Sequence, residues 1–310
     1  MTAASPCSGR STCSCCTKSA VISLRDRNLQ LCGDHFREDL EARVSQTVRE
    51  NTMIRDGDRI AVALSGGKDS TALLLLLDKV VKDYTGVSLA AITVDEGIAG
   101  YREDTVASAV RLAADLGIEH RIVSFPELFG ASLDTFLKGK ETRACTVCGI
   151  LRKKALATAA QQAGADRLAT GHNLNDEAQS VLMNVLRGDL PRLIRDSGKE
   201  TEFFIPRIKP LQEISEKEIA VYLMIRGAWR ELPECPYTRY ALRAEVRTML
   251  SKLEYDYPGT MKRLIQSRKT LSARLKKSDV SGPLQHCKQC GDPCSRELCQ
   301  VCSLLPSLRL

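Results

Sequence analysis

The stretch from Ile60 to Leu77, IAVALSGGKDSTALLLLL, joins two apolar runs through a glycine turn. The short run before the turn suits a buried strand, and the leucine-rich run after it suits a buried helix. A Walker loop would need glycine at position 62 and Ser or Thr directly after the lysine, but Val62 and Asp69 stand there. The segment therefore predicts a strand, a glycine loop of another kind, and a helix.

Similar units follow along the chain, because short β-rich runs alternate with amphipathic helical patterns. The predicted strands cover residues 59–65, 88–95, 120–125 and 166–171, and the predicted helices cover 69–84, 101–116, 147–163 and 175–186. This alternation predicts an α/β fold with a parallel sheet covered on both faces. Ligands of such sheets bind at the carboxyl ends of the strands, which is where the glycine loop falls.

Composition divides the 310 residues into three parts. Residues 1–36 and 281–310 are rich in cysteine, whereas residues 37–280 carry the strand and helix patterns. The terminal parts are too small to bury a core without a staple. No apolar run is long enough to form an export signal or to cross a membrane. Thirteen cysteines in such a chain indicate metal binding in a reducing cytoplasm rather than disulfides.

The net charge of +7 permits an anionic partner, and the basic residues are unevenly placed. Residues 257–278 contain no acidic residue and seven basic ones, namely Lys262, Arg263, Arg268, Lys269, Arg274, Lys276 and Lys277. Such a run indicates either a surface for an anion or a solvated helix face.

The hexapeptide at residues 65–70, SGGKDS, has the chemistry of a phosphate site. Gly66 and Gly67 let the backbone approach an anion closely, and the amides at the start of the following helix point toward it. Lys68 adds a positive charge, and the hydroxyls of Ser65 and Ser70 add hydrogen-bond donors. These six positions favour a phosphate cradle over a plain turn between strand and helix.

The terminal cysteines fall into two sets with zinc-ligand spacing. The first set is Cys13, Cys16, Cys32 and His35, and the second is Cys287, Cys290, Cys299 and Cys302. Two chelating pairs separated by a short loop suit tetrahedral zinc, and four protein ligands close each site, so both sites are expected to be structural. Cys7, Cys15 and Cys294 are left over, and the last two are alternative ligands in a shifted register.

The central cysteines differ from the terminal ones. Cys145 and Cys148 form a lone C-x-x-C pair, and Cys235 is the only other cysteine in the middle of the chain. Three thiolates suit an iron–sulfur cluster in which one iron stays open for a hydrosulfide or a substrate. A redox pair or a persulfide carrier at Cys145 and Cys148 is the rival interpretation, and three unrelated thiols are the simplest one.

The hexapeptide resembles the pyrophosphate loop of the N-type ATP pyrophosphatases. That resemblance implies that the loop holds the β- and γ-phosphates and that ATP is split to AMP and pyrophosphate. Together with the three cysteine sets, it makes the chain similar, from Cys13 to Cys302, to the tRNA 2-thiouridine synthetases of archaea, some bacteria and the eukaryotic cytosol. The implied fold is a PP-loop core flanked by zinc-binding modules at residues 1–36 and 281–310.

The resemblance also implies cofactors and residue roles. A [4Fe-4S] cluster would sit on the three central cysteines, and Mg²⁺ would accompany ATP. The implied ATP contacts are the hexapeptide together with Ala63, Arg152 and Gly171, although the family often has lysine where Arg152 stands. Asp176 in the segment GHNLNDEAQ is the expected carboxylate on the magnesium or phosphate side, and it also suits a helix N-terminus. Asp95, at the end of another predicted strand, is expected to face the ribose or adenine.

The implied reaction adenylates the C2 carbonyl of a tRNA uridine, after which sulfur displaces AMP. Lys68, Asp69, Asp176 and the three central cysteines are the implied catalytic groups, and the basic stretch would hold tRNA. Residues 180–193, SVLMNVLRGDLPRL, resemble the wobble-position (U34) branch, and His35 resembles the prokaryotic type, which favours an archaeal protein. Sulfide, a ubiquitin-like thiocarboxylate protein or a persulfide could donate the sulfur, and the family is commonly dimeric.

Other functions remain open on the sequence. Thiolation of U54 and synthesis of 2-thiocytidine share the loop and a three-cysteine cluster, although the paired zinc modules disfavour the latter. Amidating ligases with the same loop lack the central cysteines. A zinc-ribbon RNA-binding protein with a vestigial loop is the non-enzymatic alternative, and the intact hexapeptide with Asp176 disfavours it.

Overall fold

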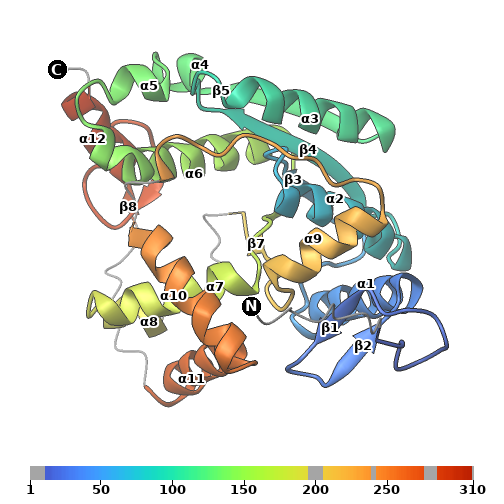
Figure 1. Cartoon of the computed structure of the whole chain (residues 1–310). Helices are drawn as coiled ribbons and strands as arrows, with labels where there is room; N and C mark the ends of the chain where they lie inside the picture. Colours follow the sequence, from blue (N-terminus) through green and yellow to red (C-terminus); the bar gives the residue numbers. More distant parts are fainter. Residues whose placement is uncertain (1–10, 195–204, 239–241, 276–284, 309–310) are drawn as a thin grey trace, which may run out of the picture.

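The computed structural model describes residues 11–194, 205–238, 242–275 and 285–308. Helices surround a central sheet (Figure 1), which has five strands. The strand order is β5-β4-β3-β6-β7, and every neighbouring pair is parallel. The strands are β3 (Arg59–Ala63), β4 (Ser88–Asp95), β5 (Glu119–Ser124), β6 (Arg167–Ala169) and β7 (Arg207–Ile208). The predicted α/β fold is therefore confirmed. The edge strand β7 was not predicted, because two residues carry no recognisable pattern.

Both faces of the sheet are buried, as a parallel sheet requires. Ile60 and Val62 of β3 face one hydrophobic cluster, and Ala61 between them faces another. Helices α1 (Gly33–Glu50), α2 (Lys68–Val80), α3 (Arg102–Asp115) and α9 (Glu216–Ile225) contribute to the first cluster. Helices α4 (Phe125–Phe129), α5 (Leu133–Phe136), α6 (Ala144–Gln162) and α12 (Gln300–Leu308) contribute to the second.

A third group of helices packs beside the sheet (Figure 1). It consists of α7 (Leu174–Leu186), α8 (Leu190–Ile194), α10 (Leu242–Asp256) and α11 (Thr260–Arg274). Leu174 and Ala178 of α7 pack with Val246 and Leu250 of α10 and with Met261 of α11 in a separate cluster. Because α7 follows β6 directly, this group lies against the carboxyl end of the sheet.

Element boundaries differ from the prediction where loops begin. Strand β3 ends at Ala63, two residues early, because Leu64 and Ser65 already belong to the glycine loop. Helix α2 ends at Val80 and continues as a 3₁₀ turn, η1 (Val81–Asp83). Helix α6 follows η2 (Glu141–Arg143) and begins at Ala144 instead of residue 147, which places Cys145 and Cys148 on one helix.

The cysteine-rich ends of the chain form two small antiparallel pairs. Strands β1 (Ile22–Leu24) and β2 (Leu29–Leu31) form a hairpin whose Leu31 shares the first cluster with Phe36 of α1. Strands β8 (Gln285–His286) and β9 (Pro293–Cys294) precede α12, which packs on the second cluster through Leu308. Cys7, Lys276, Lys277 and the break at residues 281–283 lie outside the described residues. No helix in the described ranges is long and apolar enough to span a membrane.

Candidate nucleotide and cysteine site

The glycine loop is fixed by its own serines and by α3. The Ser65 amide donates to Ser70 Oγ (3.1 Å), and the Ser70 hydroxyl donates to the Gly67 carbonyl (2.9 Å). Gly66 has φ +84°, and a Cβ there would lie 1.9 Å from the Thr105 carbonyl oxygen. Only glycine fits this left-handed, closely packed position. Gly67 is the N-cap of α2, so the first amides of that helix open onto the loop.

A cavity of about 320 Å³ opens at the carboxyl ends of the strands. Predicted ATP contacts line it, namely Ala63, Ser65, Asp69, Ser70, Arg152, Gly171 and Asp176. Gly171 lies against the loop, because a Cβ there would come within 3.1 Å of the Asp69 backbone. The fold thus brings three distant segments to one cavity that can hold a nucleotide.

Glu96, and not Asp95, is the acidic residue of β4's end that lines the cavity. Asp95 Oδ1 instead accepts the Gly97 amide (2.8 Å), and Asp95 does not line this cavity, so its contact with the ribose or adenine stays a prediction. Glu96 is 2% exposed. Adjacent residues at a strand end point to opposite sides, so only one of the two can face the cavity.

Charged side chains around Lys68 neutralise one another. Lys68 Nζ lies 3.0 Å from Asp69 Oδ2 and 2.7 Å from Glu216 Oε1. Burial alone would lower the pKa of Lys68, but these carboxylates raise it, so the lysine carries its charge at neutral pH. Burial raises the pKa of Asp69 despite the neighbouring lysine. A phosphate entering here would meet a cation that is already paired.

Asp176 has a structural role as well as a place in the cavity. Its amide donates to Asn173 Oδ1 (3.0 Å), and its Oδ2 accepts the Asn173 amide (3.3 Å), which forms a capping box on α7. Its other oxygen, Oδ1, lies 3.2 Å from Arg243 Nη1. Asp176 therefore caps α7 and also lines the cavity, while its role toward magnesium or phosphate stays a prediction.

Arg152 connects the cavity to the central cysteines. Its Nε lies 2.6 Å from Glu96 Oε1, and its Nη2 donates to Cys148 Sγ (3.1 Å). Burial would lower the pKa of Arg152, but Glu96 and Cys148 raise it. Glu96 also pairs with Arg102 Nε (2.8 Å), and Arg102 donates to the Ser65 carbonyl (3.2 Å). A continuous set of polar contacts therefore runs from the glycine loop to Cys148.

The three central cysteines, Cys145, Cys148 and Cys235, are all free thiols. Cys145 is exposed, Cys148 is buried, and Cys235 lies between these extremes. Burial raises the pKa of Cys148 to about 11, and a charge on Cys235 contributes. Burial likewise raises the pKa of Cys235, to which Cys145 adds. Among the described residues, only the two terminal sets bring three or more metal-ligating atoms within 4.8 Å of one another. The central thiols are thus more widely spaced than ligands of one zinc ion.

The terminal cysteine sets converge as their spacing predicts. The ligand atoms of Cys13, Cys16, Cys32 and His35 lie within 4.8 Å of one another, and so do those of the C-terminal four cysteines, Cys287, Cys290, Cys299 and Cys302. The Cys299 amide donates to Cys287 Sγ (3.2 Å) and, with other amides, lowers the pKa of Cys287 to about 6. Donors of this kind stabilise the thiolate that zinc requires. Cys15 and Cys294 stay outside both sets.

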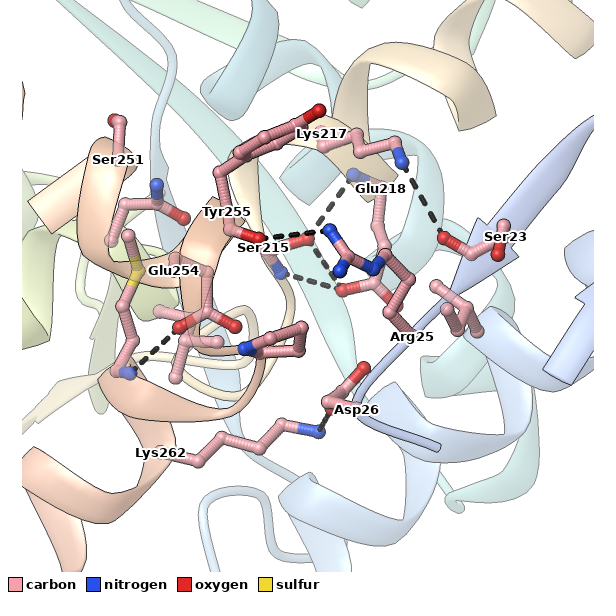
Figure 2. Close-up of a pocket in the computed structure, with 15 residues that line it drawn as sticks. Ser23, Arg25, Asp26, Ser215, Lys217, Glu218, Ser251, Glu254, Tyr255 and Lys262 are labelled. Atoms are coloured by element: carbon pink, nitrogen blue, oxygen red, sulfur yellow. Dashed lines mark hydrogen bonds and ion pairs between the residues drawn. The ribbon is translucent and has the colours of Figure 1, made fainter. Parts of the chain in front are cut away.

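A second cavity, of about 280 Å³, separates the N-terminal hairpin from α10 and α11 (Figure 2). Lys262 Nζ pairs with Asp26 Oδ2 (2.6 Å), and Arg25 Nη1 donates to the Tyr255 carbonyl (2.8 Å), so both bonds bridge this gap. The Arg25 guanidinium also lies 5.5 Å from the centre of the Tyr255 ring. The hairpin therefore holds the start of basic helix α11 in place.

Several charged residues of the site were not predicted from the sequence. Glu96, Glu216, Arg243 and Arg247 belong to no motif, and their partners lie far away in the sequence. For Glu96, strand alternation was a usable signal, because neighbouring side chains point to opposite faces and only one of Asp95 and Glu96 can face the cavity. For the others no sequence signal exists.

Comparison with known proteins agrees with this geometry. A sequence model of the PP-loop domain matches residues 36–254. The tRNA 2-thiolation protein NcsA of Haloferax volcanii is 35% identical, and the alignment covers 96% of this chain and 98% of that protein. The chain belongs to the tRNA 2-thiolation protein family. This confirms the resemblance noted from the motifs.

The match of this family member to its relatives extends over nearly its whole length. Cytoplasmic tRNA 2-thiolation protein 1 of Bos taurus is 37% identical, with 96% of this chain and 87% of that protein covered. The solved structure of "U34-tRNA thiolase NcsA from Methanococcus maripaludis with its [4Fe-4S] cluster" superposes with a TM-score of 0.81 at 30% identity, covering 96% of both chains. The terminal cysteine modules therefore belong to the shared architecture.

Proposed function

We propose that this chain is an ATP-dependent tRNA 2-thiolase that acts on the wobble uridine, U34. Family membership and the U34-tRNA thiolase neighbour support the substrate. The observation that carries the proposal is the position of Arg152, which lines the nucleotide cavity and donates to Cys148 Sγ. A uridine activated in this cavity would lie beside the three central cysteines.

The loop would prepare the uridine by adenylation. A carbonyl oxygen leaves poorly until a phosphate is attached to it, so transfer of AMP to the C2 oxygen makes sulfur substitution feasible. The amides of the glycine loop and the charge of Lys68 would hold the β- and γ-phosphates, while the α-phosphate is attacked. Mg²⁺ near Asp69 and Asp176 would supply further charge neutralisation on the departing pyrophosphate.

The three central cysteines would hold a [4Fe-4S] cluster that supplies the sulfur chemistry, with one iron free of a protein ligand. The donor set fits, because all three thiols are free and Cys145 and Cys148 lie three residues apart at the start of α6. Cys148 must lose its proton to act as a ligand, and burial opposes this. The Arg152 guanidinium offsets that penalty by hydrogen bonding to the thiolate.

The remaining parts would serve RNA binding. Zinc in the two terminal sets would staple residues 1–36 and 281–310 as modules around the catalytic domain at residues 37–280. The N-terminal module would fix α11 through the Asp26–Lys262 pair, so that its basic residues contact the tRNA backbone. The chain would work in the cytoplasm and form a homodimer.

The test is anaerobic purification of the wild type and of Cys235→Ala, followed by iron, sulfide and zinc analysis, EPR and thiolation of tRNA transcripts. About four irons and two zincs per chain are expected, with the iron lost and the zinc kept in the variant. A transcript with cytidine at position 34 should stay unmodified, while one altered at position 54 should react. Thiolation that follows position 54, or that survives loss of iron, would contradict the proposal.

The same assay separates the sulfur donors. Free sulfide, a ubiquitin-like thiocarboxylate protein and a persulfide would be supplied one at a time to the reconstituted enzyme. If no iron binds and thiolation still depends on Cys145 and Cys148, a persulfide route replaces the cluster.

A further inference from the structure

Helix α10 reaches the nucleotide site with two arginines one turn apart. Arg243 Nη1 lies 3.2 Å from Asp176 Oδ1, and Arg247 Nη2 lies 2.6 Å from Glu216 Oε1. Residues four apart share one face of a helix, so both arginines point toward the start of α7 and α9. A helix remote in sequence from the glycine loop therefore contacts the carboxylates beside that loop.

Glu216 is shared between α10 and the loop. Its single oxygen Oε1 lies 2.7 Å from Lys68 Nζ and 2.6 Å from Arg247 Nη2. The side chains of Lys68 and Glu216 are 28% and 21% exposed, so their attraction is only partly screened by water. A cation that holds Glu216 weakens its hold on the other cation, because the two compete for one oxygen.

The position of α10 is fixed by packing. Val246, between the two arginines, and Leu250 are each 1% exposed and pack on Leu174 and Ala178 of α7. At its other end, Glu254 accepts the amides of Gly259 (2.7 Å) and Met261 (2.8 Å) and so ties α10 to the start of α11. Arg247 is thus presented to Glu216 by a helix that is packed on α7 and tied to the start of the basic helix α11.

We propose that Arg247 is a positioning residue for nucleotide binding, which acts by sharing Glu216 Oε1 with Lys68 and so weakening the Glu216–Lys68 pair. The inference rests on the proposed function only in that the loop binds ATP. A phosphate can take Lys68 only in competition with Glu216, so Arg247 makes the lysine available without touching the nucleotide. Without Arg247, the charge of Glu216 acts on Lys68 alone, and nucleotide affinity falls.

The test is a double-mutant cycle on the full zinc-loaded chain with Mg²⁺ and α,β-methylene-ATP, measured by isothermal titration calorimetry. Arg247→Gln should raise Kd about fivefold. This change corresponds to the upper end of the free energies measured for exposed ion pairs. Glu216→Gln should lower Kd, because Lys68 then keeps only one of its two carboxylate partners, Asp69. In the Glu216→Gln background, Arg247→Gln should then have no effect.

Two variants serve as controls. Lys252→Gln removes the same charge from α10, where Lys252 pairs with exposed Asp256, and should leave Kd unchanged. Arg247→Lys keeps the charge and should stay near wild type even if Arg247→Gln folds poorly. An equal loss of affinity from Arg247→Gln in both backgrounds, or no loss in the wild type, would overturn the inference alone. A wild type that binds no nucleotide would overturn the proposed function itself and this inference with it.

Discussion

Gly66→Ala tests whether the loop conformation makes the nucleotide site. Gly66 has φ +84°, which costs an alanine about 1–2 kcal/mol. The added Cβ would also lie 1.9 Å from the Thr105 carbonyl oxygen and 2.7 Å from its carbon. Thr105 is 2% exposed in α3 and cannot move aside, so the loop must leave its position.

Gly67→Ala is a matched control one residue away. Gly67 has φ −74°, and the nearest atom to an added Cβ is Ser65 Oγ at 3.6 Å, an ordinary contact. Its cost should stay below about 1 kcal/mol. Both variants add one methyl group to a glycine. They differ because only Gly66→Ala strains the backbone and brings the added Cβ against the Thr105 carbonyl group.

Urea unfolding and nucleotide titration would separate the two variants. Gly66→Ala should lose at least about 2 kcal/mol of unfolding free energy and more than about tenfold in ATP affinity, because displaced amides no longer meet the phosphates. Gly67→Ala should fold normally and bind ATP within a few-fold of wild type. Equal behaviour of the two variants would refute the assigned loop conformation.

Three other expectations follow from the site. Glu96→Gln should lose about 3 kcal/mol of unfolding free energy in urea, because two arginines lose a buried partner, whereas exposed Glu119→Gln should lose under about 1 kcal/mol. In iron-free protein, iodoacetamide should alkylate Cys145 before Cys148, because the raised pKa of Cys148 leaves little thiolate at neutral pH. The alkylation rate of Cys148 should rise about tenfold per pH unit toward pH 11, and a rate that does not change with pH would contradict this. Cys302→Ser should lose one zinc per chain and keep the other, as measured by mass-spectrometric metal analysis. Loss of both zincs would show that the two ligand sets are not independent sites.

The sheet was predictable because its signals are local. Strand β4 matches its prediction from Ser88 to Asp95, since eight residues that alternate between two buried faces leave a clear pattern. The start of α6 was missed by three residues, because Ala144 to Thr146 carry no capping signal. The short edge strand β7 was missed entirely, since its pairing with β6 depends on a distant segment.

The sequence by itself determined the glycine loop, the two terminal ligand sets and the three central cysteines. Each of these depends on the spacing or order of residues within short segments, and local backbone geometry then determines how those residues lie relative to one another. Only the tertiary structure decided that Glu96 rather than Asp95 faces the cavity and that Arg152 touches Cys148. It alone placed Arg247 beside Glu216 and Lys68. Ion pairs between segments far apart in the chain depend on how the helices pack. The charged residues that form these pairs show no periodic pattern in the sequence from which the pairing could be predicted.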